Sequence, residues 1–143
     1  MLLKSKPART QRGFTLLELL VVLVILGLLA AVGGPQVMKY VSSAKSDTAK
    51  LQVEELSAAL DMYKLEVGRH PNTQEGLQAL VEAPAGASNW NGPYLKKKTV
   101  PKDPWGADYH YAAPGQHGVF DLYSLGADGR EGGEGEDKDI VNW

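Results

Sequence analysis

The chain contains no cysteine among its 143 residues. Its absence excludes disulfide bonds, thiol catalysis and zinc sites built on cysteine. Small exported domains often rely on disulfides, so a chain of that kind would need another means of holding its loops. Charge is also scarce in one place, because Glu18 is the single charged residue between Phe14 and Val32.

The segment from Phe14 to Val32 is 19 residues long and almost wholly apolar. A helix of that length measures about 28 Å, which is close to the hydrocarbon thickness of a bilayer. An unpaired carboxylate inside such a span costs at least about 2.5 kcal/mol. Glu18 therefore needs a partner, and no basic residue lies within the span.

Four basic residues and no acid precede the span: Lys4, Lys6, Arg9 and Arg12. By the positive-inside rule, the N-terminus stays in the cytoplasm and the remainder crosses the membrane. An ordinary secretory signal carries its cleavage site after the apolar region. Here Gly13 stands before that region, so a cut after Gly13 would leave the span on the mature protein. The alternative is an uncleaved signal anchor with an incidental glutamate.

The charge balance changes once the first 13 residues are set aside. The chain has 15 basic and 17 acidic residues, and four of the basic ones lie in that stretch, so the remainder carries a net charge of −6. Such acidity does not indicate a nucleic-acid-binding protein. The length fits one domain with a modest core.

Residues 14 to about 67 are predicted to form one long helix, apolar first and amphipathic later. Gly33-Gly34-Pro35 interrupts the pattern. A proline inside a helix removes one backbone hydrogen bond and clashes with the preceding turn. We expect a kink there, and the alternative is a break into two separate helices.

Two apolar stripes follow the proline, each with alternating steps of three and four residues that place it on one helix face. We expect the second stripe to pack against a globular domain and the first to meet another subunit. The first stripe consists of Val37, Val41, Ala44, Thr48 and Leu51, and the second of Val53, Leu56, Leu60, Tyr63 and Val67.

The rest of the domain indicates an α+β fold. Asn72 or Thr73 can cap a short helix from about Gln74 to Glu82. Alternating residues at 109–111 and 119–124 flank a turn at 114–118, which predicts an antiparallel hairpin. The helix stripe would pack on one face of this small sheet.

Residues 125–143 are rich in glycine and acidic residues and end in Ile140-Val141-Asn142-Trp143. One interpretation is a disordered acidic tail. The other is a loop anchored at both ends that binds a hard cation, because calcium takes six to eight oxygens from carboxylates and carbonyls. An EF-hand does not fit, since Arg130 stands at the third position and Asp139 at the twelfth.

The segment Gly13-Phe14-Thr15-Leu16-Leu17-Glu18 resembles the processing site of type IV pilins and pseudopilins. The resemblance implies that a prepilin peptidase cuts after Gly13 and methylates the amine of Phe14. It also implies that Glu18 pairs with the N-terminal amine of a neighbouring subunit during filament assembly.

Four further motifs are similar to those of the major pseudopilins of type II secretion systems. They are Gly68-Arg69-His70-Pro71, Gln74-Glu75-Gly76-Leu77-Gln78-Ala79-Leu80, Asp103-Pro104-Trp105-Gly106 and Leu125-Gly126-Ala127-Asp128-Gly129. The resemblance implies a long helix packed on a small antiparallel sheet with a calcium-binding C-terminal loop. It divides the chain into a leader (1–13), a transmembrane and filament-core helix (14–35) and a periplasmic domain (36–143).

The same resemblance implies a function and a location. The expected protein is a single-pass inner-membrane subunit with a cytoplasmic N-terminus, and it polymerises into a helical periplasmic filament that helps export proteins through an outer-membrane secretin. The expected partners are further copies of the chain, minor pseudopilins, the prepilin peptidase and the inner-membrane assembly platform. The chain is expected to lie in the membrane before assembly and to bind no nucleic acid. The alternative is a pilin-like subunit for adhesion or DNA uptake.

The pseudopilin resemblance also implies the ligands of a calcium ion. Asp128 and Asp139 would supply carboxylates, and Leu125 and Arg130 would supply backbone carbonyls. Further candidate acids are Glu134, Glu136 and Asp137.

Enzyme chemistry has no support in the sequence. His70, His110 and His117 show no ligand or triad spacing, and Ser88 and Ser124 have no evident partners. No phosphate-binding loop is present. The expectation is therefore a structural protein.

Overall fold

The computed structural model describes residues 13–143, and these fall into two compact units that meet between Met38 and Lys39. One helix, α1 (Leu16–Val67), contributes to both. Gly33-Gly34-Pro35 lies inside α1, so the alternative of two separate helices is wrong, while the kink stays a prediction. The predicted leader lies outside the described residues except for Gly13.

The second unit contains the remaining elements. They are the 3₁₀ helix η1 (Leu77–Leu80), strands β1 (His110–Ala112) and β2 (Asp121–Ser124), the 3₁₀ helix η2 (Gly135–Asp137) and strand β3 (Ile140–Val141). The sheet is antiparallel with the order β1-β2-β3. The α+β prediction is therefore confirmed, as is the predicted hairpin.

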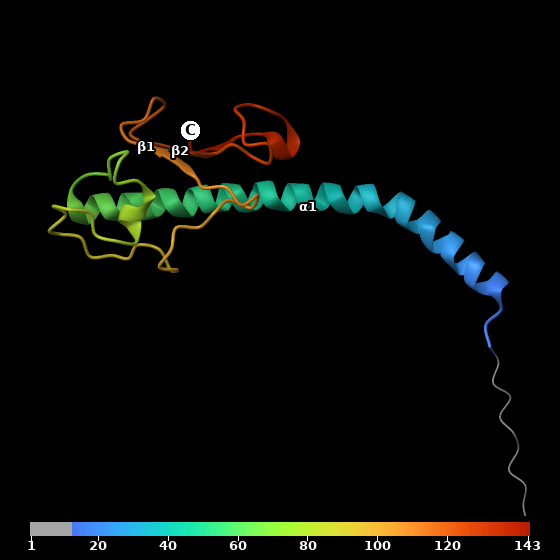
Figure 1. Ribbon diagram of the computed structural model, residues 1–143. Coiled ribbons are helices and arrows are strands. Elements are labelled where there is room, and N and C mark those ends of the chain that lie inside the picture. Colours follow the sequence, from blue (N-terminus) through green and yellow to red (C-terminus); the bar gives the residue numbers. More distant parts are fainter. Residues whose placement is uncertain (1–12) are drawn as a thin grey trace, which may run out of the picture. The chain divides into compact units, whose positions relative to one another are not determined.

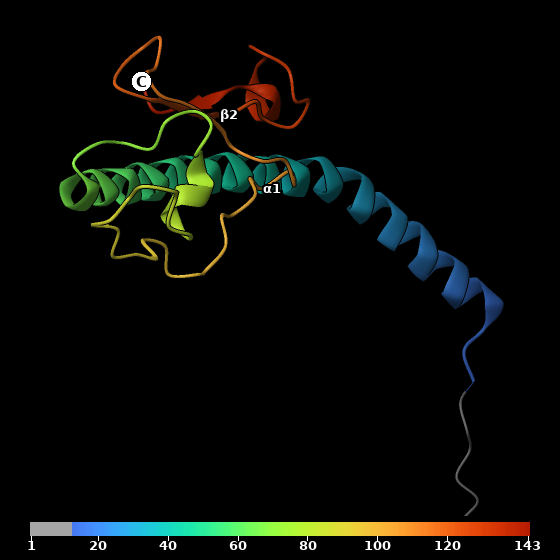
Figure 2. The same ribbon diagram turned by 60° about the vertical axis from the view of Figure 1, so that its left-hand side comes forward.

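The core of this unit lies along the second stripe of α1. Leu56, Leu60 and Tyr63 are fully buried. They pack with Leu80 of η1 and Leu122 of β2. Figures 1 and 2 show the sheet along one side of α1 and the yellow-to-gold segment between η1 and β1 along the other. Burying each leucine contributes roughly 1.5–3 kcal/mol of transfer free energy. One face of α1 therefore holds both η1 and the sheet against the helix.

The predicted helix over 74–82 is wrong in its type and length. Residues 73–76 form a turn, and η1 covers Leu77–Leu80 only. Asn72 closes this turn and does not cap η1: its Oδ1 accepts from the Glu75 N–H at 2.8 Å, and Glu75 Oε2 accepts from the Asn72 N–H at 2.8 Å. The N-cap of η1 is Gly76, which makes no side-chain hydrogen bond there. Gly76 has φ +59°, which ends the regular turn and needs glycine.

Candidate functional site

The start of α1 carries the predicted processing and assembly residues. Phe14 is 82% exposed, and no atom beyond its chain neighbours would lie within 4 Å of a Cβ at Gly13. The peptide bond between these two residues is therefore not covered by other described parts of the chain. Glu18 lies in the first turn of α1.

Glu18 and Thr15 satisfy each other's backbone. Glu18 Oε2 accepts from the Thr15 N–H at 2.9 Å, and Thr15 Oγ1 accepts from the Glu18 N–H at 3.2 Å. This is a capping box, in which two free donors of the first helical turn are paired at once. The carboxylate also lies at the helix end where the dipole favours a negative charge.

Thr15 is a residue that the sequence analysis missed. The signal was present, since a threonine followed three residues later by a glutamate before an apolar run is the pattern of a capping box. The prediction that Glu18 needs a partner considered basic residues only, and none lies within the span. The structure shows a partner that carries no charge.

The apolar part of α1 is unprotected. Within the described residues, α1 is the one helix long and apolar enough to cross a membrane, and its most apolar stretch has no buried residue. Leu16, Leu23 and Val32 are exposed over two-thirds or more of their surface. This segment therefore needs lipid or other helices around it.

The two stripes of α1 differ in exposure as predicted. The second stripe is buried at Val53, and Val67 packs against the core. In the first stripe, Val37 is 60% exposed and Leu51 is 56% exposed. The first stripe thus remains available for contact outside the folded domain.

The C-terminal loop is folded rather than a free tail. Ile140 pairs with Ser124 across β2 and β3, so the end of the loop returns to the strand from which it left. The Ala127 N–H donates to the Glu136 carbonyl at 2.8 Å. The predicted anchoring of residues 140–141 is therefore confirmed.

Asp139 is the best-placed of the predicted ligands. Its Oδ2 accepts from the Gly132 N–H at 2.9 Å, while its Oδ1 is buried and has no hydrogen-bond partner within residues 13–143. A buried carboxylate oxygen without a donor costs free energy. A cation beside Oδ1 would remove that cost, so this atom fits a calcium ligand.

The other predicted ligands lie around the same loop. Asp128 is exposed, and its Oδ1 accepts from the Arg130 N–H at 3.1 Å. Leu125 is half-buried at the loop entry. Glu134 and Asp137 are exposed. No three acidic or histidine side chains converge within the part of the chain that the structure describes, so a cation here would depend on backbone carbonyls as well.

Ser124 has a partner, contrary to the sequence analysis. Its Oγ donates to Asp103 Oδ2 at 2.6 Å, and both residues are buried. The two residues are 21 positions apart in the sequence, so no local pattern predicts that they pair. No histidine takes part in it, so the pair gives no activated nucleophile.

His117 lies in a second polar cluster. Its Nδ1 is 3.0 Å from Asp121 Oδ2, and its ring stacks on Trp143 with centroids 4.0 Å apart. Burial of Asp121 opposes its ionisation, but hydrogen bonds from the Gln116 N–H and from His117 hold the pKa of Asp121 below its usual range. The cluster ties the chain end to the hairpin turn.

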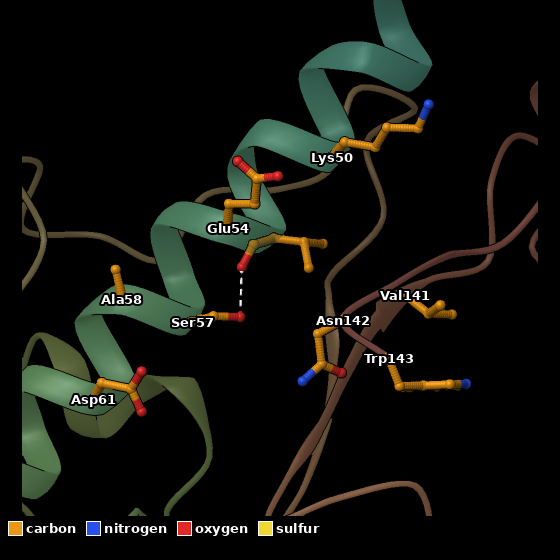
Figure 3. Close-up of a pocket in the computed structure, with 9 residues that line it drawn as sticks. Lys50, Glu54, Ser57, Ala58, Asp61, Val141, Asn142 and Trp143 are labelled. Carbon is orange, nitrogen blue, oxygen red and sulfur yellow. Dashed lines mark hydrogen bonds between the residues drawn. The ribbon is translucent and has the colours of Figure 1, made fainter.

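A groove of about 510 Å³ runs between α1 and the last residues of the chain. Figure 3 shows Glu54 and Asp61 on the helix side and Asn142 and Trp143 on the other. Ser57 Oγ donates to the Val53 carbonyl at 2.7 Å and is thereby engaged in its own helix. The groove carries charge but no nucleophile beside a base.

Comparison with known families gives two matches along the chain. Residues 36–143 match the family described as type II secretion system protein G, and residues 8–34 match the prokaryotic N-terminal methylation motif. Together the two matches span the apolar helix and the folded domain.

Individual relatives agree with the family matches. The type II secretion system core protein G of Pseudomonas aeruginosa is 56% identical over an alignment of 139 residues, and the alignment covers 94% of this chain and 96% of the relative. The protein of the same name in Vibrio cholerae is 48% identical over 141 residues, covering 96% and 95%. The crystal structure of the major pseudopilin from the type 2 secretion system of enterohaemorrhagic Escherichia coli superposes with a TM-score of 0.62 and 35% identity, covering 74% of this chain and 92% of that one.

Proposed function

The chain belongs to the protein G family of type II secretion systems, the major pseudopilins, and we propose that it is the repeating subunit of a periplasmic filament that promotes protein export. It is a structural subunit and not an enzyme. The family favours this function over the alternative of a pilin for adhesion or DNA uptake. The observation that carries the proposal is the 56% identity with core protein G, which extends over nearly the full length of both chains.

The apolar half of α1 anchors the subunit in the inner membrane before assembly. The proposed orientation has a cytoplasmic N-terminus, because the basic residues precede the span, and a periplasmic domain. The prepilin peptidase cuts after Gly13 and methylates Phe14. Support comes from the methylation motif at residues 8–34 and from the exposure of Phe14.

Assembly transfers the exposed apolar helix from lipid into a bundle of helices. The partners proposed for this step are further copies of the chain, minor pseudopilins and the inner-membrane assembly platform. The exposed first stripe, including Val41 and Leu51, is the surface by which a second copy would extend the contact beyond the membrane. Such head-to-tail contacts do not close, and so they generate a helical filament.

Glu18 sets the axial position of each subunit in this proposal. Its side chain is exposed although Oε2 holds the Thr15 N–H. The positively charged amine of a neighbour's Phe14 would neutralise the carboxylate, which removes the cost of a charge in an apolar surrounding. One carboxylate and one amine per subunit give each copy a single register.

The C-terminal loop is proposed to bind calcium through Asp139, Asp128 and the carbonyls of Leu125 and Arg130. The buried, unpartnered Oδ1 of Asp139 supports this set. A bound calcium ion would neutralise acidic charge and join the two ends of the loop. In a chain without cysteine, this would fix the loop without a disulfide.

Mass spectrometry of the chain purified from bacterial membranes tests the proposed processing. The expected mature protein begins at Phe14 and carries one added methyl group on its amine. A chain that keeps Met1, or one cut near Ala30-Ala31, would contradict the proposal.

A further inference from the structure

A buried carboxylate and hydroxyl join two distant parts of the second unit. Asp103 is 5% exposed and Ser124 is fully buried. Ser124 Oγ donates to Asp103 Oδ2 at 2.6 Å, and Asp103 Oδ1 accepts from the N–H groups of Trp105 at 3.1 Å and Ala107 at 2.8 Å. Both oxygens of Asp103 therefore have hydrogen-bond partners inside the protein.

The turn that carries Asp103 is closed upon itself. The Asp103 N–H donates to the Ala107 carbonyl at 2.8 Å, and the Gly106 N–H donates to the Asp103 carbonyl at 3.0 Å. Gly106 has φ +91°, which favours glycine at that position. Asp103 is therefore a fixed support for the hydroxyl of Ser124.

Ser124 in turn contacts the backbone at the start of the C-terminal loop. Its Oγ accepts from the Gly126 N–H at 3.2 Å. The Gly126 N–H and the Leu125 carbonyl belong to one planar peptide group, and in a trans peptide they point in opposite directions. Holding the N–H against Ser124 therefore fixes the direction of the Leu125 carbonyl.

A second contact holds the next peptide group, between Gly126 and Ala127. A Cβ at Gly126 would lie 2.6 Å from the Glu136 carbonyl oxygen, and φ of Gly126 is +69°. The neighbouring Ala127 N–H donates to that carbonyl at 2.8 Å. The loop entry is thus held between Ser124 and the backbone of residue 136, with no room for a side chain.

We propose that Asp103 and Ser124 are positioning residues of the calcium loop, which aim the Leu125 carbonyl as a ligand before an ion arrives. This inference rests on the calcium site proposed above. Neither residue touches the ion. Residues that orient ligands in this way typically change metal affinity by about 10–100-fold when they are replaced.

The test is a calorimetric titration of the full chain in detergent micelles with calcium chloride. Ser124→Ala should weaken calcium binding by about 10–100-fold, whereas Ser124→Thr, which keeps the hydroxyl, should restore binding. Tyr111→Phe is the matched control, because it removes a hydroxyl that donates to the Pro71 carbonyl at 2.8 Å. It should lower the melting temperature in chelator and leave the calcium dissociation constant unchanged.

Hydrogen exchange of the Gly126 amide in chelator gives a readout that needs no ion. The amide should be protected in the wild type and exchange faster in Ser124→Ala. Should Ser124→Ala fail to fold, Asp103→Asn serves in its place, because an amide nitrogen facing Ser124 cannot accept the hydroxyl proton. Its calcium affinity should fall in the same direction.

Two outcomes overturn the proposal, and the wild-type titration separates them. If the wild type binds calcium and Ser124→Ala binds it equally well, the positioning role is wrong and the calcium site stands. If the wild type binds no calcium, the proposed site and the positioning role both fall.

Discussion

Thr15 and Glu18 hydrogen-bond to each other in both directions at the first turn of α1, at 2.9 and 3.2 Å. Glu18 therefore caps its own helix, in addition to the proposed pairing with the amine of a neighbouring subunit. A capping box accepts glutamine as well as glutamate at this position. The cap and the charge can therefore be separated by substitution.

Glu18→Gln and Glu18→Ala should both block filament assembly while cleavage after Gly13 continues. Glutamine keeps an oxygen for the Thr15 N–H but loses the negative charge that would pair with a neighbour's amine. Sheared filaments seen by electron microscopy, together with the mass of the processed chain, report the two steps separately. Thr15→Ser, which keeps the capping hydroxyl, is the control and should assemble. Normal filaments from Glu18→Gln would show that the cap, and not the charge, is what assembly requires.

Calcium should raise the melting temperature of the full chain in detergent relative to chelator. A ligand that binds only the folded state stabilises it by about 2.7 kcal/mol at a hundredfold excess over its dissociation constant. Asp128→Ala and Asp139→Ala should each remove most of the difference. Magnesium should substitute poorly, since it needs near-ideal octahedral geometry.

Glu82→Ala is the matched control for the calcium experiment, because Glu82 is an exposed acid outside the loop. It should keep the full calcium response. Equal melting temperatures of the wild type in calcium and in chelator would show that residues 128–139 are an acidic segment that binds no calcium.

Glu75 should make stability depend on pH. The hydrogen bonds from Arg69, at 2.6 and 2.7 Å, hold the pKa of Glu75 below its usual range, with a further contribution from the Asn72 N–H. A group with a lowered folded-state pKa stabilises the fold fully above its unfolded pKa, about 4.3, and loses that contribution as pH falls through the folded value.

Glu75→Gln should therefore melt below the wild type at pH 7, and the gap should close as the pH falls below about 4. Glutamine keeps an oxygen for the Asn72 N–H, so the gap reports the charge. Melting temperatures across a pH series check this, with Glu82→Gln as the exposed control. A gap that stays constant from pH 7 to pH 2 would rule out the ion pair as its cause.

The sequence predicts the features that depend on local pattern. The period of three and four residues identified the buried stripe at Leu56, Leu60 and Tyr63, and alternation identified the hairpin. The sequence predicted an α-helix where the structure has the 3₁₀ helix η1. The positive φ of Gly76 interrupts the helical backbone just before η1 begins, and only the folded turn shows that φ. Propensity alone does not distinguish that turn from a helix.

Contacts between distant residues were the least predictable. Ser124, at the end of β2, meets Asp103 only in the folded domain, and no spacing in the sequence encodes a pair 21 residues apart. Asp139 was named as a ligand from resemblance alone. Its unpartnered Oδ1 became visible only once the loop was seen folded.

The central claim is that this chain is a structural subunit of a secretion filament, and export from living cells tests it most directly. In a strain that lacks the gene, the distribution of a secreted enzyme between periplasm and medium is measured with no complement, with the wild-type chain and with Glu18→Ala. We expect the enzyme to stay in the periplasm without the chain, to reach the medium with the wild type, and to stay behind with Glu18→Ala. Unchanged export in the deleted strain, together with a loss of adhesion or DNA uptake, would contradict the account.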